Sequence, residues 1–144
     1  MTIDSILGSK GRDVATVSKD RSLLDAAELL RDHGVGALVV SDDGRNIVGI
    51  VSERDLVRAI AMHGSGGLVR KVAEVMTSEV ITCTAADSID ELMAAMTEHR
   101  VRHVPVVDAE GLLAGIVSIG DVVKVRVNSL ERENQTLNDY IHAR

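Results

Sequence analysis

The sequence predicts an α/β (α+β) fold in which two tandem β-α-β-β-α repeats are related by pseudo-two-fold symmetry and followed by a C-terminal helical extension. The first observation is an internal repeat: Gly49–Asp55 reads GIVSERD, and Gly115–Asp121, 66 residues later, reads GIVSIGD. The second is that strand-like, helix-like and turn-like segments follow in the same order in both halves. The third is a heptad spacing of apolar residues confined to the end of the chain.

An ungapped offset of 66 residues also pairs identical residues outside that motif. The pairs are Val14 with Val80, Thr16 with Thr82, Ser22 with Ser88, His33 with His99, Val35 with Val101, Val40 with Val106, Asp42 with Asp108 and Val57 with Val123. We therefore divide the chain into repeat 1 with an N-terminal lead-in (1–66), repeat 2 (67–127) and the helical extension (128–144). We expect the function to lie between the two copies.

Composition narrows the class of protein. The 144 residues include no Phe or Trp and a single tyrosine, Tyr140, so the core must be aliphatic. A net charge of −6 disfavours nucleic-acid binding, which depends on neutralising phosphates. One cysteine, Cys83, suits a reducing cytoplasm, and no apolar run approaches the roughly 20 residues of a membrane span. We expect a soluble, cytoplasmic protein with no membrane or nucleic-acid partner.

The first elements of repeat 1 follow from local signals. Residues 14–17 form a short apolar run that suits a strand. Ser22 and Asp25 have the spacing of a helix cap, and the apolar residues after Ser22 recur on one helical face. His33 and Gly34 end this helix, because glycine tolerates the left-handed conformation that often follows a helix.

The rest of repeat 1 reads as a hairpin and a second helix. We predict strands at 36–40 and 47–51 around a turn at 42–45, which is rich in Asp and Gly. The helix that starts at Ser52 runs to about residue 62. The glycine-rich residues 63–67 are then expected to form a flexible joint.

Repeat 2 is predicted to reproduce this order after a short helical lead-in at 68–76, of which residues 3–7 are the N-terminal counterpart. The expected elements are a strand at 80–83, a helix at 88–99, strands at 103–107 and 112–117 around a turn at 109–111, and a helix from residue 118.

The tail has a different pattern. Val123, Leu130 and Leu137 are seven residues apart, and so are Val127, Asn134 and Ile141. Interleaved, the two sets give a heptad seam with Asn at one a position. The terminal helix could pack on its own domain, pack on a partner subunit, or form a coiled coil, and we favour a helix packed at a dimer contact.

Ser52 and Ser118 each start a helix directly after a buried strand. Amides exposed at such a start, together with the helix dipole, can bind a phosphate, and Asp55 or Asp121 could accept hydrogen bonds from a ribose diol. The same Ser-x-x-Asp spacing is also a plain capping box. Ser22 and Ser88 show the chain using such caps where no ligand is implied.

With GIVS-x-x-D in both halves and HVPVVD at His103–Asp108, the sequence resembles a tandem CBS-domain pair, or Bateman module, over residues 1–127. The resemblance implies a stand-alone regulatory module rather than an enzyme. It implies that an adenosine-containing ligand such as AMP, ADP, ATP, NAD(H) or S-adenosylmethionine binds in the cleft between the repeats. No cofactor is required, and a homodimer and a regulated partner protein are implied.

The resemblance assigns Asp55 and Asp121 to the ribose, and Thr16 and Thr82 to adenine or phosphate, although threonine is also an ordinary strand residue. Arginine and histidine side chains would supply positive charge, and small residues would let a purine approach the backbone. The complete set of expected ligand-binding residues is Thr16, Val35, Gly36, Ala37, Ser52, Arg54, Asp55, Thr82, Arg102, His103, Val104, Pro105, Ser118 and Asp121.

Two departures predict that the two clefts bind differently. Leu38–Val40 replaces the Val-Pro-Val of residues 104–106, and Ile119 and Gly120 replace Glu53 and Arg54, which removes a basic residue from the second motif. The His and Cys residues lack the paired spacing of metal ligands, so we expect neither a metal site nor catalysis. The alternative function is a ligand-free dimerisation scaffold.

Overall fold

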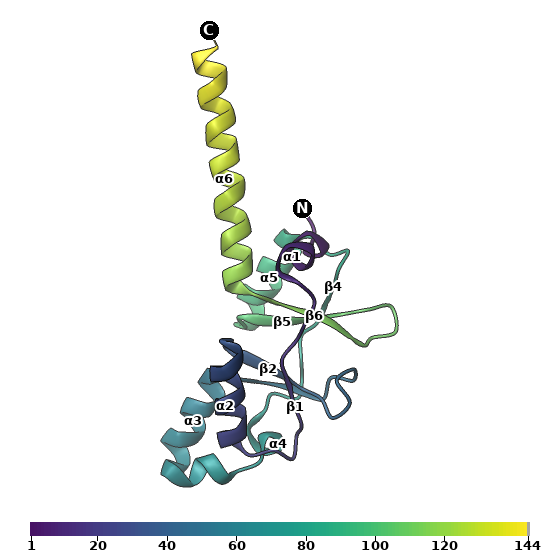
Figure 1. Cartoon of the computed structure of the whole chain (residues 1–144), viewed down its shortest axis with the longest axis vertical. Helices are drawn as coiled ribbons and strands as arrows, with labels where there is room; N and C mark the ends of the chain where they lie inside the picture. The colour runs from purple at the N-terminus through teal and green to yellow at the C-terminus, as the bar shows by residue number, and fades with distance from the viewer. Residues whose placement is uncertain (144) are drawn as a thin grey trace.

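The computed structural model describes residues 1–143 as two stacked halves from which one long helix projects (Figure 1). The helices are α1 (Ile3–Lys10), α2 (Leu23–His33), α3 (Glu53–His63), α4 (Val72–Val75), α5 (Ile89–His99) and α6 (Ile119–His142), with a 3₁₀ segment, η1 (Gly64–Val69). The strands are β1 (Thr16–Val17), β2 (Ala37–Val40), β3 (Gly49–Ser52), β4 (Cys83–Thr84), β5 (His103–Val107) and β6 (Leu113–Ser118). The predicted β-α-β-β-α order is confirmed in both halves.

Each half contains one three-stranded sheet with the same topology. In the first, β1 runs parallel to β2, and β2 pairs antiparallel with β3; β4, β5 and β6 repeat this order. Ala37 lies opposite Ser52 in the first sheet, and His103 lies opposite Ser118 in the second. The register is therefore equivalent at the point where each sheet meets the following helix.

The strand predicted at 80–83 is observed only as Cys83–Thr84, and a proline accounts for the late start. In the first sheet the amide of Val39 donates to the carbonyl of Ala15 at 3.2 Å. The residue at the equivalent position of the second sheet is Pro105, which has no amide hydrogen to donate. The second ladder therefore begins one residue later than the first.

The caps predicted from the sequence are present. The Ser22 hydroxyl accepts the amide of Asp25 at 3.1 Å, and the Ser88 hydroxyl accepts the amide of Glu91 at 3.0 Å. α2 ends at Gly34, which has the left-handed conformation expected of it, with φ 64°. α5 ends in the same way at Arg100, with φ 55°.

The two lead-in helices exchange places. Ile3, Ile6 and Leu7 of α1 lie in the core of the second half, together with residues of β4, α5, β5 and β6. Val72 of α4 is fully buried in the core of the first half. Figure 1 shows α1 beside α5 in the upper half and α4 in the lower half. Each lead-in thus packs on the repeat that it does not precede in the sequence.

The glycines that open the repeated motif are explained by this exchange. A Cβ at Gly49 would lie 2.6 Å from Met76 Sδ and 2.9 Å from the Thr77 carbonyl oxygen. A Cβ at Gly115 would lie 2.9 Å from Leu7 Cδ2. In both repeats the chain segment that leads into the other repeat presses against this strand. Close packing therefore favours glycine at both positions, whether or not a ligand binds.

The predicted flexible joint at 63–67 is wrong, because residues 64–67 form the start of η1. Gly67 is buried against the end of α3, and a Cβ there would lie 2.9 Å from the Ala59 carbonyl oxygen. The amide of Arg70 donates to the Gly67 carbonyl at 3.2 Å. Glycine serves close packing at this point rather than chain flexibility.

α6 packs on the body only through its first turns. Val122 is buried and Val125 lies against the core of the second half, whereas every residue from 130 to 143 is exposed. Figure 1 shows the rest of the helix extending away from the body. Packing of this helix along its own domain is therefore wrong beyond those turns. No helix in residues 1–143 has the length and hydropathy needed to cross a bilayer.

Candidate functional site

In each repeat the start of a central strand is tied to the start of a helix. The amide of Glu53, the first residue of α3, donates to the carbonyl of Gly36 at 3.0 Å. The amide of Ile119, the first residue of α6, donates to the carbonyl of Arg102 at 2.8 Å. The offset of 66 residues therefore reproduces this backbone arrangement. We call it the duplicated corner: the first corner is Gly36 with residues 52–55, and the second is Arg102 with residues 118–121. Each corner brings predicted ligand residues from two elements together.

Both Ser-x-x-Asp pairs form complete capping boxes. The Ser52 amide donates to Asp55 Oδ2 at 2.9 Å, and the Asp55 amide donates to Ser52 Oγ at 3.4 Å. The Ser118 amide donates to Asp121 Oδ2 at 2.9 Å, and the Asp121 amide donates to Ser118 Oγ at 3.2 Å. These pairs therefore cap α3 and α6.

These contacts limit what each helix start can offer to an anion. The strand carbonyl takes the first amide of the helix, and the serine hydroxyl takes the third. Within residues 1–143, the amides of Arg54 and Gly120 are the first-turn donors left over. Around Gly120 the backbone is open, since a Cβ there would meet only Ser118 Oγ, at 3.6 Å. An anion at either helix would need side chains in addition to one amide.

The two repeats face each other at Gly36 and His103. A Cβ at Gly36 would lie 3.3 Å from Cε1 and Nε2 of the His103 imidazole and 3.7 Å from Glu53 Oε1. The imidazole thus covers the face of Gly36 where a purine edge was expected to approach. A second link is the amide of Leu113, which donates to the Arg45 carbonyl at 2.8 Å.

His103 is a poor candidate for a cation. Burial lowers its pKa below the usual 6.5, and this effect outweighs the opposing attraction of Glu53. The side chain is therefore neutral at pH 7, whereas the sequence suggested that it would supply positive charge. A neutral imidazole can still donate one hydrogen bond and accept another.

The second corner holds a residue that the sequence did not identify. Lys10, the last residue of α1, places its Nζ 2.7 Å from Asp121 Oδ2 and 3.1 Å from the Ile116 carbonyl oxygen. Lys10 and Asp121 are 111 residues apart, so no local pattern could pair them. Lys10 supplies the basic group that Gly120 lacks in comparison with Arg54.

Lys10 also changes the acidity of Asp121. Burial is the largest single effect and would raise the pKa of this carboxyl group. The hydrogen bond from Lys10, that from the Ser118 amide and the charge of Lys10 together outweigh it, so the pKa lies below the usual 3.8. Asp121 is therefore ionised near neutral pH. The ion pair is half-buried, with side chains 33% and 22% exposed.

The remaining predicted residues are of three kinds. Ala37 and Val104 have buried side chains in the two cores, and Pro105 is buried beside Val104, so these three could offer a ligand only backbone. Thr16 is half-buried in β1, and Thr82 is exposed just before β4. Val35, Arg54 and Arg102 also have exposed side chains.

An open hollow of about 570 Å³ adjoins the first corner. It lies between α2 and α3 and holds Val35 and Gly36 from the predicted set. All its lining residues belong to repeat 1: Ala27, Leu30, Arg31, Gly34, Val35, Gly36, Glu53, Leu56 and Val57. This hollow is therefore on one repeat and is distinct from the cleft expected between the two.

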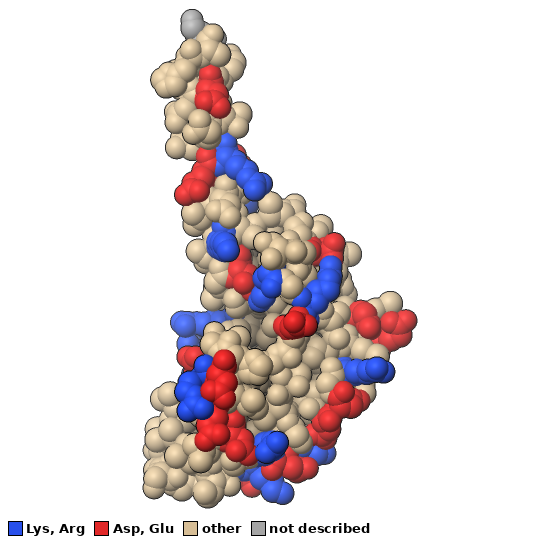
Figure 2. Space-filling view, viewed as in Figure 1, with Lys and Arg blue, Asp and Glu red and all other residues tan. Residues whose placement is uncertain are grey.

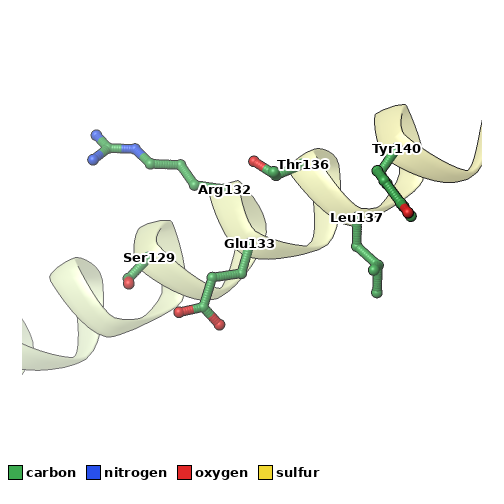
Figure 3. Close-up of a pocket in the computed structure, with 6 residues that line it drawn as sticks. All are labelled: Ser129, Arg132, Glu133, Thr136, Leu137 and Tyr140. Atoms are coloured by element: carbon green, nitrogen blue, oxygen red, sulfur yellow. The ribbon is translucent and has the colours of Figure 1, made fainter. Parts of the chain in front are cut away.

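A second hollow, of about 530 Å³, lies along the outer turns of α6 (Figure 3). Its lining consists of Ser129, Arg132, Glu133, Thr136, Leu137 and Tyr140, all from a single helix. Figure 3 shows Arg132 and Thr136 on one side of the helix and Glu133 and Leu137 on the other. It is a groove between side chains and far from the duplicated corners, so we do not assign a ligand to it.

Residues 1–143 contain no group of three or more His, Cys, Asp or Glu side chains placed to hold a metal. Burial, with a smaller contribution from Asp87, raises the pKa of the Cys83 thiol to about 12. A thiol of this kind is a poor nucleophile. Figure 2 shows acidic and basic side chains interspersed on the viewed face, without a continuous basic surface.

Comparison with known families decides the classification. The family profile of the CBS domain matches residues 10–62 and again residues 72–128. The chain belongs to the CBS-domain family. The two matches confirm the tandem pair inferred from the repeated motif.

Solved structures of CBS-domain proteins share this fold. The CBS-domain containing protein ATU1752 from Agrobacterium tumefaciens is 48% identical, with a TM-score of 0.84 covering 88% of this chain and 99% of that one. The CBS domain pair of protein MJ0100, in complex with 5-methylthioadenosine and S-adenosyl-L-methionine, is 25% identical, with a TM-score of 0.79 covering 90% and 98%. Protein PAE2072 from Pyrobaculum aerophilum, complexed with AMP, is 28% identical, with a TM-score of 0.75 covering 84% and 89%.

Proposed function

We propose that this CBS-domain pair is a regulatory, non-enzymatic module that binds an adenosine-containing ligand between its repeats and signals to a partner protein. The observation that supports it best is the duplicated corner, where a strand start, a helix start and a Ser-Asp pair recur in both repeats and face each other near Gly36 and His103. The ligands named for MJ0100 and PAE2072 share an adenosine group. AMP, ADP, ATP and NAD(H) are the ligands to test first.

The two corners are expected to bind with different strength. At the first, Arg54 brings a guanidinium group, which binds phosphate in bidentate fashion, and Asp55 is engaged only in its cap. At the second, Gly120 offers an open amide, but Asp121 is already paired with Lys10. A ligand would have to take Lys10 away from Asp121. Lys10 could then bind the phosphate, while Asp121 accepts hydrogen bonds from the ribose hydroxyl groups.

The mechanism we propose is a population shift. A ligand that contacts both repeats favours the angle between them at which both contacts form, and it can shift this angle only by its difference in affinity for the two states. The surface offered to a partner protein changes with that angle. Cytoplasmic location and the existence of a regulated partner protein stay predictions from the sequence.

Calorimetric titration with AMP, ATP and NAD tests the proposal directly. A ligand present at about 100 times its Kd stabilises the fold by about 2.7 kcal/mol, which corresponds to a rise in Tm of roughly 5–10 °C for a chain of this size. Because the protein has one Tyr and no Trp, ligand that co-purifies would also dominate the absorbance near 260 nm. No heat and no change in Tm with any adenosine ligand would favour the ligand-free scaffold instead.

Substitution of the two aspartates separates binding from capping. Asp55→Ala and Asp121→Ala should each weaken binding at their own corner by about 10- to 100-fold, since hydrogen bonds to a charged group contribute roughly 1.5–3 kcal/mol. Loss of the cap alone should destabilise the fold by about 1 kcal/mol. Both quantities can be measured by titration and by urea unfolding.

Asp25→Ala is the control, because Asp25 occupies the same third position of α2, after Ser22, and belongs to neither corner. Its carboxylate pairs with Arg21 instead of closing a capping box. The substitution should lower stability slightly and leave the affinity unchanged. Equal losses of affinity in all three variants would show that the aspartates act only through the fold.

A further inference from the structure

We propose that α6 pairs with α6 of a second copy of this chain in a parallel, in-register, two-stranded coiled coil. The seam runs from Val123 to Ile141. It is formed by the residues at the a positions (Val127, Asn134 and Ile141) and at the d positions (Val123, Leu130 and Leu137). The proposal is independent of ligand binding at the duplicated corners.

The seam is an apolar stripe that the chain itself leaves uncovered. Val123, Val127, Leu130, Leu137 and Ile141 are between 46% and 59% exposed. Large aliphatic side chains at a 3-4 spacing on one face of a helix are the pattern of a two-stranded seam. The apolar stripe is only wide enough to contact one other helix, which favours a second helix as its partner.

The stability of the outer turns also requires a partner. Most helical stability in proteins comes from packing of an apolar face, and isolated helices shorter than about 12–15 residues are marginal in water. Every residue from 130 to 143 is exposed, and Figure 1 shows this part of the helix extending away from the body. The turns beyond Val127 also contain Asn128, Asn134, Thr136 and Asn138, which favour helix less than Ala or Leu. Burial of the seam would supply the missing stabilisation.

Asn134 indicates which arrangement forms. In a parallel, in-register pair the two Asn134 side chains meet at the same a layer and can hydrogen-bond to each other, which fixes register and favours two strands. In an antiparallel pair that overlaps the same six positions, Asn134 would face Leu130 of the second copy. The buried amide would then lack a partner, which is costly.

The flanking charges favour the same arrangement. In a parallel pair, Arg126 at a g position faces Glu131 at the e position of the next heptad on the other helix, and this occurs on both sides. In the antiparallel pair, Glu131 and Glu133 would each approach their own counterparts. Within the single chain, Arg126 Nη2 donates a hydrogen bond to Asp90 Oδ1 at 2.6 Å. That pair is largely exposed, so exchanging it costs little.

A cysteine at the Asn134 position tests both pairing and direction in the full-length protein. A parallel register would bring the two Cα atoms of residue 134 within the distance of about 7 Å that a disulfide requires. Asn134→Cys should therefore cross-link nearly completely under mild oxidation at micromolar protein concentration. The native Cys83 is buried and gives little background.

Thr136→Cys is the matched control, because it places a thiol two residues further along, outside the seam. It should stay largely uncross-linked under the same conditions. Efficient cross-linking of Asn134→Cys alone supports the parallel coiled coil. Failure of Asn134→Cys to cross-link, or equal cross-linking of both variants, would overturn it.

Light scattering of a charged variant provides a second measurement. Leu130→Glu combined with Leu137→Glu places four acidic side chains in the seam of a pair, so the mass measured at about 10 μM should fall from that of a dimer to that of a monomer. Both positions are exposed in the single chain, so the body should remain folded by circular dichroism. A dimer that persists in this variant would contradict the proposal, and nucleotide titration of the same variant reports separately on the proposed function.

Discussion

At the scale of single residues, Arg100 occupies a position that a glycine fills in the other repeat. Gly34 and Arg100 both follow a helix with positive φ, 64° and 55°. For a residue with a Cβ this conformation costs roughly 1–2 kcal/mol, whereas glycine adopts it freely. The second repeat therefore carries local backbone strain that the first does not.

Replacing Arg100 by Gly should stabilise the protein by about 0.5–1 kcal/mol, because relief of the strain exceeds the entropy that glycine adds to the unfolded chain. The midpoint of urea unfolding would report this, provided that the m-value is unchanged. Gly34→Ala is the reverse experiment and should destabilise by a similar amount. A lower midpoint for Arg100→Gly would indicate that the arginine side chain makes a stabilising contact.

The Lys10–Asp121 pair should make stability depend on pH. Because the pKa of Asp121 is lower in the folded than in the unfolded protein, its contribution is fully present above the ordinary value of 3.8. It is lost as the pH falls through the folded pKa. Unfolding measured between pH 6 and 2.5 should therefore show a smaller loss of stability in Asp121→Asn than in the wild type.

Lys10→Met should reduce the same acid-dependent loss, since burial alone raises the pKa of Asp121. The effects of the two substitutions should not add, because they remove one interaction. Additive effects would show that other carboxylates dominate in this pH range.

At the scale of elements, the two glycines of the repeated motif face different neighbours. A side chain at Gly49 would meet the backbone oxygen of Thr77, whereas one at Gly115 would meet the end of the Leu7 side chain. A side chain can rotate away, but a backbone carbonyl held by the fold cannot. The two repeats thus have the same residue at this position but differ in how well they tolerate a side chain there.

Gly49→Ala should accordingly destabilise by about 1–3 kcal/mol, the usual cost of overpacking, and Gly115→Ala by less. Thermal unfolding of the two variants side by side would establish the order. A larger loss for Gly115→Ala would mean that Leu7 is held more rigidly than the Thr77 backbone.

The elements themselves could largely be predicted from the sequence, because their signals are local. Ser22, Ser52, Ser88 and Ser118 cap the helices that they were expected to cap. The late start of β4 at Cys83 follows from the missing amide of Pro105, and it could have been anticipated from the repeat alignment.

Other features could not be predicted because they depend on contacts far apart in the chain. The packing of α1 against the second half and the pairing of Lys10 with Asp121 join segments more than 70 residues apart. The buried Gly67 is another case, since the composition around it is that of a linker. For the candidate site, the sequence identified the duplicated corner and His103, but it identified neither Lys10 nor the contact by which His103 covers Gly36.

At the scale of the whole molecule, the exchange of lead-in helices makes each half depend on the other's segment. The core of the first half needs Val72, and the core of the second needs Ile3, Ile6 and Leu7. The complete core of the first half is therefore contained in residues 12–77 rather than in 1–66. A fragment cut at the boundary of the sequence repeat lacks part of its core and exposes α1.

The two fragments have equal length and can be compared directly. Residues 12–77 should show more helical circular dichroism and a more cooperative thermal transition than residues 1–66, because buried apolar area drives folding. Equal behaviour of the two fragments would mean that α4 contributes little to its core.

The length of the projecting helix α6 amplifies any tilt at its base. α6 starts at Ile119, directly after Ser118 of the candidate site, and its 24 residues correspond to about 36 Å at 1.5 Å per residue. A turn of about 5° at its base would carry the far tip through about 3 Å, if the helix remains straight. A tilt at the second corner that is too small to alter the contacts there would therefore displace the far end of the helix by about the length of a hydrogen bond.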